Sequence, residues 1–360
     1  MLSHGFTARR RSLAVPPNGV GRVATTSGPG ARNERRIICD VGKLAIAATG
    51  VVAGVCLLAL ARAQPIRSAR PPALLTYAAV FAKSLVLSRP PRGAICVARA
   101  DGSGRRRLLG GTFLGDPAWS PRGRLIAFTR RTGGTGPQEE ISIADARGRF
   151  IRNLSQGYAF FNRDPTWSPN GKQIAFAFSD IHTGAIAIAN ADGSDKHPLA
   201  NGLFGIAGSP SWSPNGREIL YSEASITSDT DVFVIDADGQ NNRLLVHNAM
   251  QPVYSPDGSK IAYVSVDYQH TGGNIVIENA DGSHPHVITH QNADLHPAWS
   301  PSGTRLAFNR LKNGRYSIVV AKTDGSHART VVGSRAYEAL DPTWRPPTAL
   351  PRMRRPTCRR

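Results

Sequence analysis

The residues of this sequence that could do chemistry share one position. Each stands three places before an aromatic residue and directly before a proline. Carboxylate, imidazole, amide and hydroxyl groups can bind a cation or a positively charged group. The alternative is a local role, in which each side chain caps the bend at the proline by bonding to nearby backbone N–H. Six residues occupy the position: Asp116, Asp164, Ser209, Gln251, His296 and Asp341.

Two further groups of residues look like metal ligands. His284, His286, His290 and His296 form the densest histidine cluster, and the run Asp236–Gly239 begins like a calcium-binding loop. Both groups include residues of an Asp-Gly turn, where polar side chains are simply solvated. We therefore predict no metal site and no cofactor.

No catalytic constellation accompanies these residues. The Gly-x-Ser-x-Gly motif of α/β-hydrolases and the Walker loop of nucleotide hydrolases are both absent from the sequence. The sequence therefore favours a binding protein over an enzyme.

The polar position belongs to a repeat that fills most of the chain. One full copy, Asp164–Phe176, contains two strands and a turn at Ser168–Gly171, where Ser, Pro and Gly suit a type I turn. The aromatic recurs every 42 to 48 residues, a period typical of propellers and similar arrays. We expect the six aromatics to pack between repeats: Trp119, Trp167, Trp212, Tyr254, Trp299 and Trp344.

The consensus Pro-x-Trp-Ser-Pro-x-Gly-x-x-Ile-Ala-Phe resembles the WD40-like (PD40) repeats of TolB-type β-propellers. The resemblance covers roughly residues 85–344. It implies that the aromatic strand is innermost and that the six polar residues form a ring near one mouth of a central channel. The chain departs from full TolB proteins because it lacks their N-terminal α/β domain.

The order of the repeats predicts how the ring closes. The second strand type first occurs at Leu85–Arg89 and the third at Ile95–Gly102, whereas the last aromatic strand, Asp341–Trp344, stands at the C-terminal end. One copy of the third strand, Ile141–Gly148, is weaker because its Asp-Gly turn has become Arg147-Gly148. We predict an all-β, six-bladed β-propeller over residues 85–345, with one-plus-three closure of the last blade.

The chain ends carry most of the net charge of +19. Residues 1–43 are basic and poor in apolar residues, which predicts disorder. Residues 44–61 are apolar and uncharged, so the segment 44–63 is either a single-pass membrane anchor or a signal-peptide core cleaved after Ala63. The remaining predicted segments are a linker at 64–84 and a basic tail at 346–360.

Two cysteines remain outside the N-terminal segments. Cys96 falls on the third strand of the closing blade and Cys358 in the basic tail. A disulfide between them would link the two chain ends, and it could persist outside the cytoplasm. The alternative is that Cys96 faces the core as a small apolar residue.

Together these features predict an extracytoplasmic propeller, membrane-anchored or secreted, that binds a protein or peptide in the cell envelope. One alternative is a carbohydrate-active propeller enzyme with a metal at the channel mouth. Another is a polyanion or cell-wall binder that uses the basic ends. No nucleic-acid partner is expected.

Overall fold

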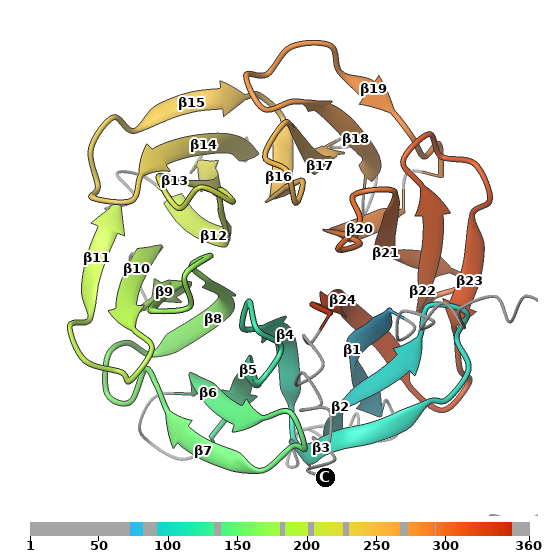
Figure 1. Cartoon of the computed structure of the whole chain (residues 1–360), viewed down its shortest axis with the longest axis horizontal. Helices are drawn as coiled ribbons and strands as arrows, with labels where there is room; N and C mark the ends of the chain where they lie inside the picture. Colours follow the sequence, from blue (N-terminus) through green and yellow to red (C-terminus); the bar gives the residue numbers. More distant parts are fainter. Residues whose placement is uncertain are drawn as a thin grey trace, which may run out of the picture. The chain divides into compact units, whose positions relative to one another are not determined.

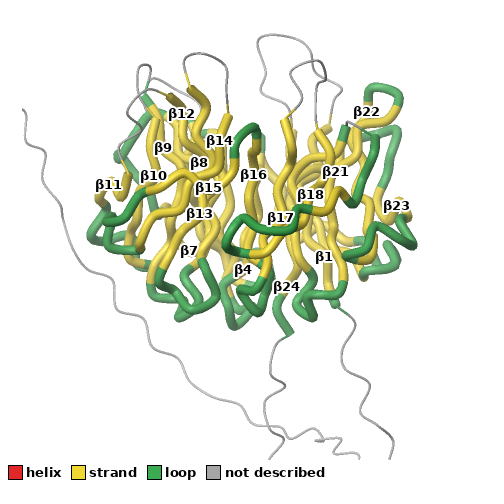
Figure 2. Tube along the Cα trace, turned by 90° about the horizontal axis from the view of Figure 1, so that it is seen from above, coloured by secondary structure: helices red, strands yellow, loops and turns green. Residues whose placement is uncertain are grey.

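The computed structural model describes residues 73–81, 92–132, 138–180, 184–200, 205–225, 230–266, 273–291 and 293–347. All regular elements in these ranges are β-strands (Figure 2). None of the described residues forms a helix long and apolar enough to cross a membrane. The predicted membrane or signal segment, residues 44–61, lies outside the described ranges.

Successive strands pair antiparallel in groups of four, each group being one blade. The first blade contains β4 (Leu114–Trp119), β5 (Leu125–Arg131), β6 (Glu139–Asp145) and β7 (Phe150–Asn153). The second contains β8 (Phe161–Trp167), β9 (Gln173–Ser179), β10 (Gly184–Asn190) and β11 (His197–Ala200). The third contains β12 (Gly205–Trp212), β13 (Glu218–Ser225), β14 (Thr230–Asp236) and β15 (Arg243–Val246).

The next two blades repeat the arrangement. The fourth contains β16 (Ala249–Tyr254), β17 (Lys260–Val266), β18 (Gly273–Asn279) and β19 (His286–Val287). The fifth contains β20 (Asp294–Trp299), β21 (Arg305–Lys312), β22 (Arg315–Lys322) and β23 (Arg329–Val332). Single residue pairs, Glu139 with Phe161 and Gly273 with Asp294, join two of these blades to their neighbours.

The last sheet is built from both ends of the described chain. Its order is β24-β1-β2-β3, with bounds β24 (Glu338–Arg345), β1 (Leu74–Phe81), β2 (Arg92–Arg99) and β3 (Arg106–Thr112). β24 runs antiparallel to β1 from Leu74 opposite Arg345 to Val80 opposite Glu338. This is the one-plus-three pairing that the repeat order predicted.

The second strand of this sheet differs from the sequence prediction. We expected Leu85–Arg89 in that place and a linker before residue 85, but the structure places β1, Leu74–Phe81, there. Leu75 and Tyr77 of β1 are almost completely buried, which explains why this apolar run takes the position. The predicted strand Leu85–Arg89 lies outside the described residues.

The blades surround a central axis (Figure 1). The six aromatic strands β4, β8, β12, β16, β20 and β24 are innermost, and the short fourth strands lie at the rim (Figure 1). The core lies between blades, since each apolar cluster draws on two of them. Trp212 of β12, for example, packs with Ala175 of β9 and Ile186 of β10.

Candidate functional site

All six polar residues lie on the innermost strands, and all six have a positive φ between 49° and 55°. The strand pairing slips at each of them, as between Gly115 and Ala118 on β4. Such a bulge inserts an extra residue and re-aims a side chain. A positive φ is unfavourable for residues with a β-carbon, so its repetition in every blade indicates a shared structural task.

At four of the six junctions between blades, that task is a hydrogen bond from one blade to the next. The backbone N–H of Asp116 donates to Asp341 Oδ2 at 3.3 Å. The N–H of Ser209 donates to Asp164 Oδ2 at 2.9 Å, and that of His296 donates to Gln251 Oε1 at 2.8 Å. Asp116 likewise accepts a bond from the backbone N–H of Asp164.

We call these six residues the channel ring. The capping role proposed from the sequence is right only in the kind of bond, because four of the six side chains, those of Asp116, Asp164, Gln251 and Asp341, accept backbone N–H groups. In the four bonds above, however, the donor is the equivalent residue of the next blade, 45 to 48 positions along the chain or across its two ends. The channel ring therefore also ties neighbouring blades together.

His296 joins the channel ring on two sides. Its Nε2 lies 2.7 Å from Gln251 Nε2, and its Nδ1 lies 3.3 Å from Asp341 Oδ1. Because Gln251 Oε1 accepts the His296 backbone N–H, the Gln251 amide NH2 must donate to His296 Nε2. The ring proton then belongs on Nδ1, where it faces the Asp341 carboxylate.

The carboxyl groups of the channel ring lie close enough that the charge on one makes it less favourable to ionise another. Burial raises the pKa of Asp116 well above its usual range, and the charges of Asp164 and Asp341 raise it further. The Thr129 hydroxyl, which donates to Asp116 Oδ2 at 2.7 Å, opposes this shift. Burial also raises the pKa of Asp164, whereas the bond from the Ser209 N–H lowers it. A cation entering the channel ring would relieve this repulsion.

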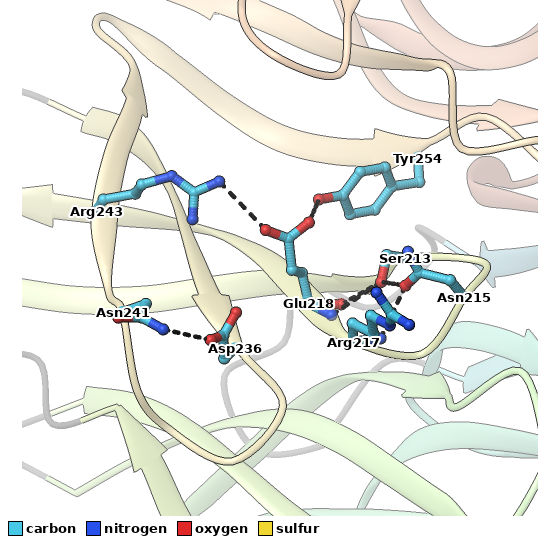
Figure 3. Close-up of polar contacts among 8 residues, drawn as sticks. All are labelled: Ser213, Asn215, Arg217, Glu218, Asp236, Asn241, Arg243 and Tyr254. Carbon is cyan, nitrogen blue, oxygen red and sulfur yellow. Dashed lines mark hydrogen bonds and ion pairs between the residues drawn. The ribbon is translucent and has the colours of Figure 1, made fainter.

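The candidate metal ligands named from the sequence do not come together in the described part of the chain. No three His, Cys, Asp or Glu side chains among the described residues are placed to hold a metal ion. His284 and His286 are exposed beside the turn between β18 and β19. Asp236 Oδ2 accepts a bond from Asn241 Nδ2 at 2.6 Å within its own hairpin (Figure 3).

The aromatics are structural groups buried between blades. The five tryptophans are only 6–8% exposed. Trp167 Nε1 donates to Ala118 O at 3.1 Å, and Trp299 and Trp344 make the same bond to the preceding blade. They therefore do not form a ligand face.

Tyr254 replaces tryptophan in the fourth blade. Its hydroxyl lies 3.4 Å from Glu218 Oε2, and Arg243 Nη2 lies 3.2 Å from Glu218 Oε1 (Figure 3). Burial raises the pKa of the phenol, and the charge of Glu218 adds to this. The phenol hydroxyl thus has a polar partner, as is usual for a buried tyrosine.

Cys96 lies on β2, where it is half-buried and has no disulfide partner among the described residues. It packs against the cluster that contains Leu75, and burial raises the pKa of its thiol. Cys358 lies outside the described residues, so the disulfide between the two stays a prediction.

The sheets around one axis and the channel ring define the class of protein, a β-propeller. The family model described as TolB beta propeller domain (PD40) matches residues 219–349. The Tol-Pal system protein TolB of Alcanivorax borkumensis is 34% identical over 82 residues. That alignment covers 22% of this chain and about a fifth (19%) of the relative. These matches confirm the resemblance to TolB-type repeats.

Solved structures extend the likeness at the level of the fold. TolB from Acinetobacter baumannii superposes with a TM-score of 0.63 at 18% identity, covering 76% of this chain and 67% of that one. A structure of a nidogen/laminin complex gives a TM-score of 0.60 at 13% identity, covering 76% of this chain and 100% of that one. Since such identities show the fold alone, function has to be argued from the site.

Proposed function

We propose that this protein is a binding module that receives a positively charged segment of a protein or peptide at its channel ring. The observation that carries the proposal is the convergence of three aspartates, Asp116, Asp164 and Asp341, on the innermost strands, where a charge on one of them raises the pKa of another. A lysine or arginine side chain, or a free amino terminus, would neutralise them.

The geometry of the channel ring favours a rigid, pre-arranged acceptor. Each aspartate is oriented by a bond from the next blade or from a neighbouring hydroxyl, so the ring loses little freedom on binding. His296, which is 33% exposed, faces Asp341 at 3.3 Å. The imidazole therefore helps to hold the Asp341 carboxylate in place for the ligand.

The location of the module follows from features that the sequence alone supplies. We propose that the propeller acts in the cell envelope on the extracytoplasmic side, held by residues 44–61 or released by cleavage after Ala63. The similarity to a Tol-Pal system protein supports an envelope partner.

The enzyme alternative receives less support than binding. It required a metal at the channel mouth, and the described residues do not gather three metal ligands there. The alternative of a polyanion binder relied on the two basic ends, residues 1–43 and 346–360, which lie outside the described residues.

A display selection tests the proposal. Random linear peptides would be selected for binding to the full chain. Each enriched peptide would then be tested for binding to a variant in which Asp116, Asp164 and Asp341 are all changed to asparagine. We expect the enriched peptides to share a lysine or arginine and to lose binding to the variant, because asparagine keeps the shape but removes the charge. Enriched peptides that bind both proteins equally would contradict the proposal.

A further inference from the structure

A basic hollow lies next to the C-terminal end of β4, at the end of that strand that is farther from the channel ring. It has a volume of about 430 Å³ and is formed by the turn after β4, the β6–β7 hairpin and the end of β24. Arg124, Arg147, Arg149 and Arg345 line it together with a single acid, Asp145. Four guanidinium groups against one carboxylate leave a formal charge of +3.

The internal repeats show that these arginines are not required by the fold. The place of Arg345, directly after the aromatic, is serine in the other five copies. The place of Arg147 is aspartate in the other five, and the place of Arg149 is serine in four and Gln240 in the fifth. Three repeat positions have thus become arginine at one junction, where β24 meets the first blade.

Arg345 is fixed across this junction. Its Nε and Nη2 donate to Gly123 O at 3.2 and 2.9 Å, and its guanidinium lies 4.6 Å above the Trp119 ring. Burial lowers its pKa, and the charge of Arg106 lowers it further. One face of the hollow is therefore a positioned cation with Nη1 still available among the described contacts.

Asp145 does not neutralise the hollow. Its Oδ1 accepts bonds from the backbone N–H groups of Arg147 and Arg149, both at 2.9 Å. Its Oδ2 lies 3.3 Å from Arg149 Nε. The carboxylate thus holds the shape of the hairpin that carries Arg147 and Arg149. Among the described residues, neither Arg124 nor Arg147 forms an ion pair.

We propose that this hollow binds a phosphoryl group, as a phosphomonoester or a diphosphate. Guanidinium forks match phosphate oxygens in two-point hydrogen bonds, and several forks from different elements can converge on the three oxygens of one group. An open hollow with an excess of arginine satisfies this chemistry. The site is separate from the channel ring, so either proposal can fail alone.

Isothermal titration calorimetry on the full chain at constant ionic strength tests the site. The probe is pyrophosphate, and the test variant is R147D/R149S, which installs residues that sibling repeats carry in their own hairpins. We expect the variant to weaken binding about tenfold or more, because two charge-assisted contacts are lost. Unchanged affinity, or no heat with the native protein, overturns the proposal.

A matched pair of variants controls for general charge. Arg124→Ser and Arg217→Ser remove arginine from the same repeat position, but only Arg124 lines the hollow. We expect Arg124→Ser alone to weaken pyrophosphate binding, and equal weakening by both variants contradicts a defined site.

Glycerol 3-phosphate in a further arm separates monoester from diphosphate ligands. Citrate binding as tightly as pyrophosphate overturns the phosphoryl assignment.

Discussion

Trp212 differs from Trp167 in the hydrogen bonding of its indole nitrogen. Trp167 and Trp212 are 7% and 8% exposed, but Trp167 Nε1 donates to Ala118 O whereas Trp212 Nε1 has no partner among the described residues. Replacing either by phenylalanine removes the same atoms from a similar interface. The loss of stability caused by the smaller side chain should therefore be nearly the same in the two variants.

The remaining difference is the hydrogen bond. Trp167→Phe removes the indole donor, while the Ala118 carbonyl keeps its strand partner Ala127 on β5, so the net cost is that of one hydrogen bond, about 0.5–1.5 kcal/mol. Trp212→Phe removes a donor that is already unpaired. We expect Trp167→Phe to lower the free energy of unfolding by about 0.5–1.5 kcal/mol more than Trp212→Phe does.

Urea denaturation followed by far-ultraviolet circular dichroism measures this difference without relying on indole fluorescence. Trp299→Phe serves as a second test, since Trp299 Nε1 donates to Val253 O at 3.2 Å. It should behave like Trp167→Phe. Equal losses for Trp167→Phe and Trp212→Phe would refute the hydrogen-bond reasoning and leave packing as the whole role of these residues.

Two further predictions concern the channel ring and the closing blade. Because burial and neighbouring charge raise the folded-state pKa of Asp116, its contribution to stability is present below the unfolded pKa and is lost as pH rises through the folded pKa. Asp116→Asn should thus raise the melting temperature relative to the native protein at about pH 8 and much less at about pH 4; a pH-independent difference contradicts this. Deleting residues 338–360 removes β24 from β1 and should markedly lower the melting temperature, while deleting only 348–360 should not; equal effects would show that the closure is unimportant.

The repeat made most of the fold predictable. The Ser-Pro-x-Gly turns form as expected, for example with Gly171 N–H donating to Ser168 O at 2.8 Å and Ser168 Oγ accepting from Gln173 N–H at 2.9 Å. These contacts are local, so sequence spacing defines them. The innermost position of the aromatic strands likewise followed from the resemblance of the repeats.

Features that depend on the distance between blades could not be predicted in the same way. The first strand, Leu74–Phe81, departs from the repeat spacing because it follows burial and pairing with β2 and β24. The partner of Asp164 is Ser209 N–H, 45 positions away. The change to Arg147 was visible as a weak repeat, but only the folded chain brings it beside Arg345.

A double-mutant cycle tests the central claim, that the channel ring receives a positive charge. A lysine peptide from the selection and its norleucine counterpart would each be titrated into the native protein and into the triple Asp→Asn variant of Asp116, Asp164 and Asp341. The account predicts a coupling energy of about 1.5 kcal/mol or more between the ligand ammonium and the channel ring. A coupling energy near zero would contradict the claim, whatever the affinity of the peptide.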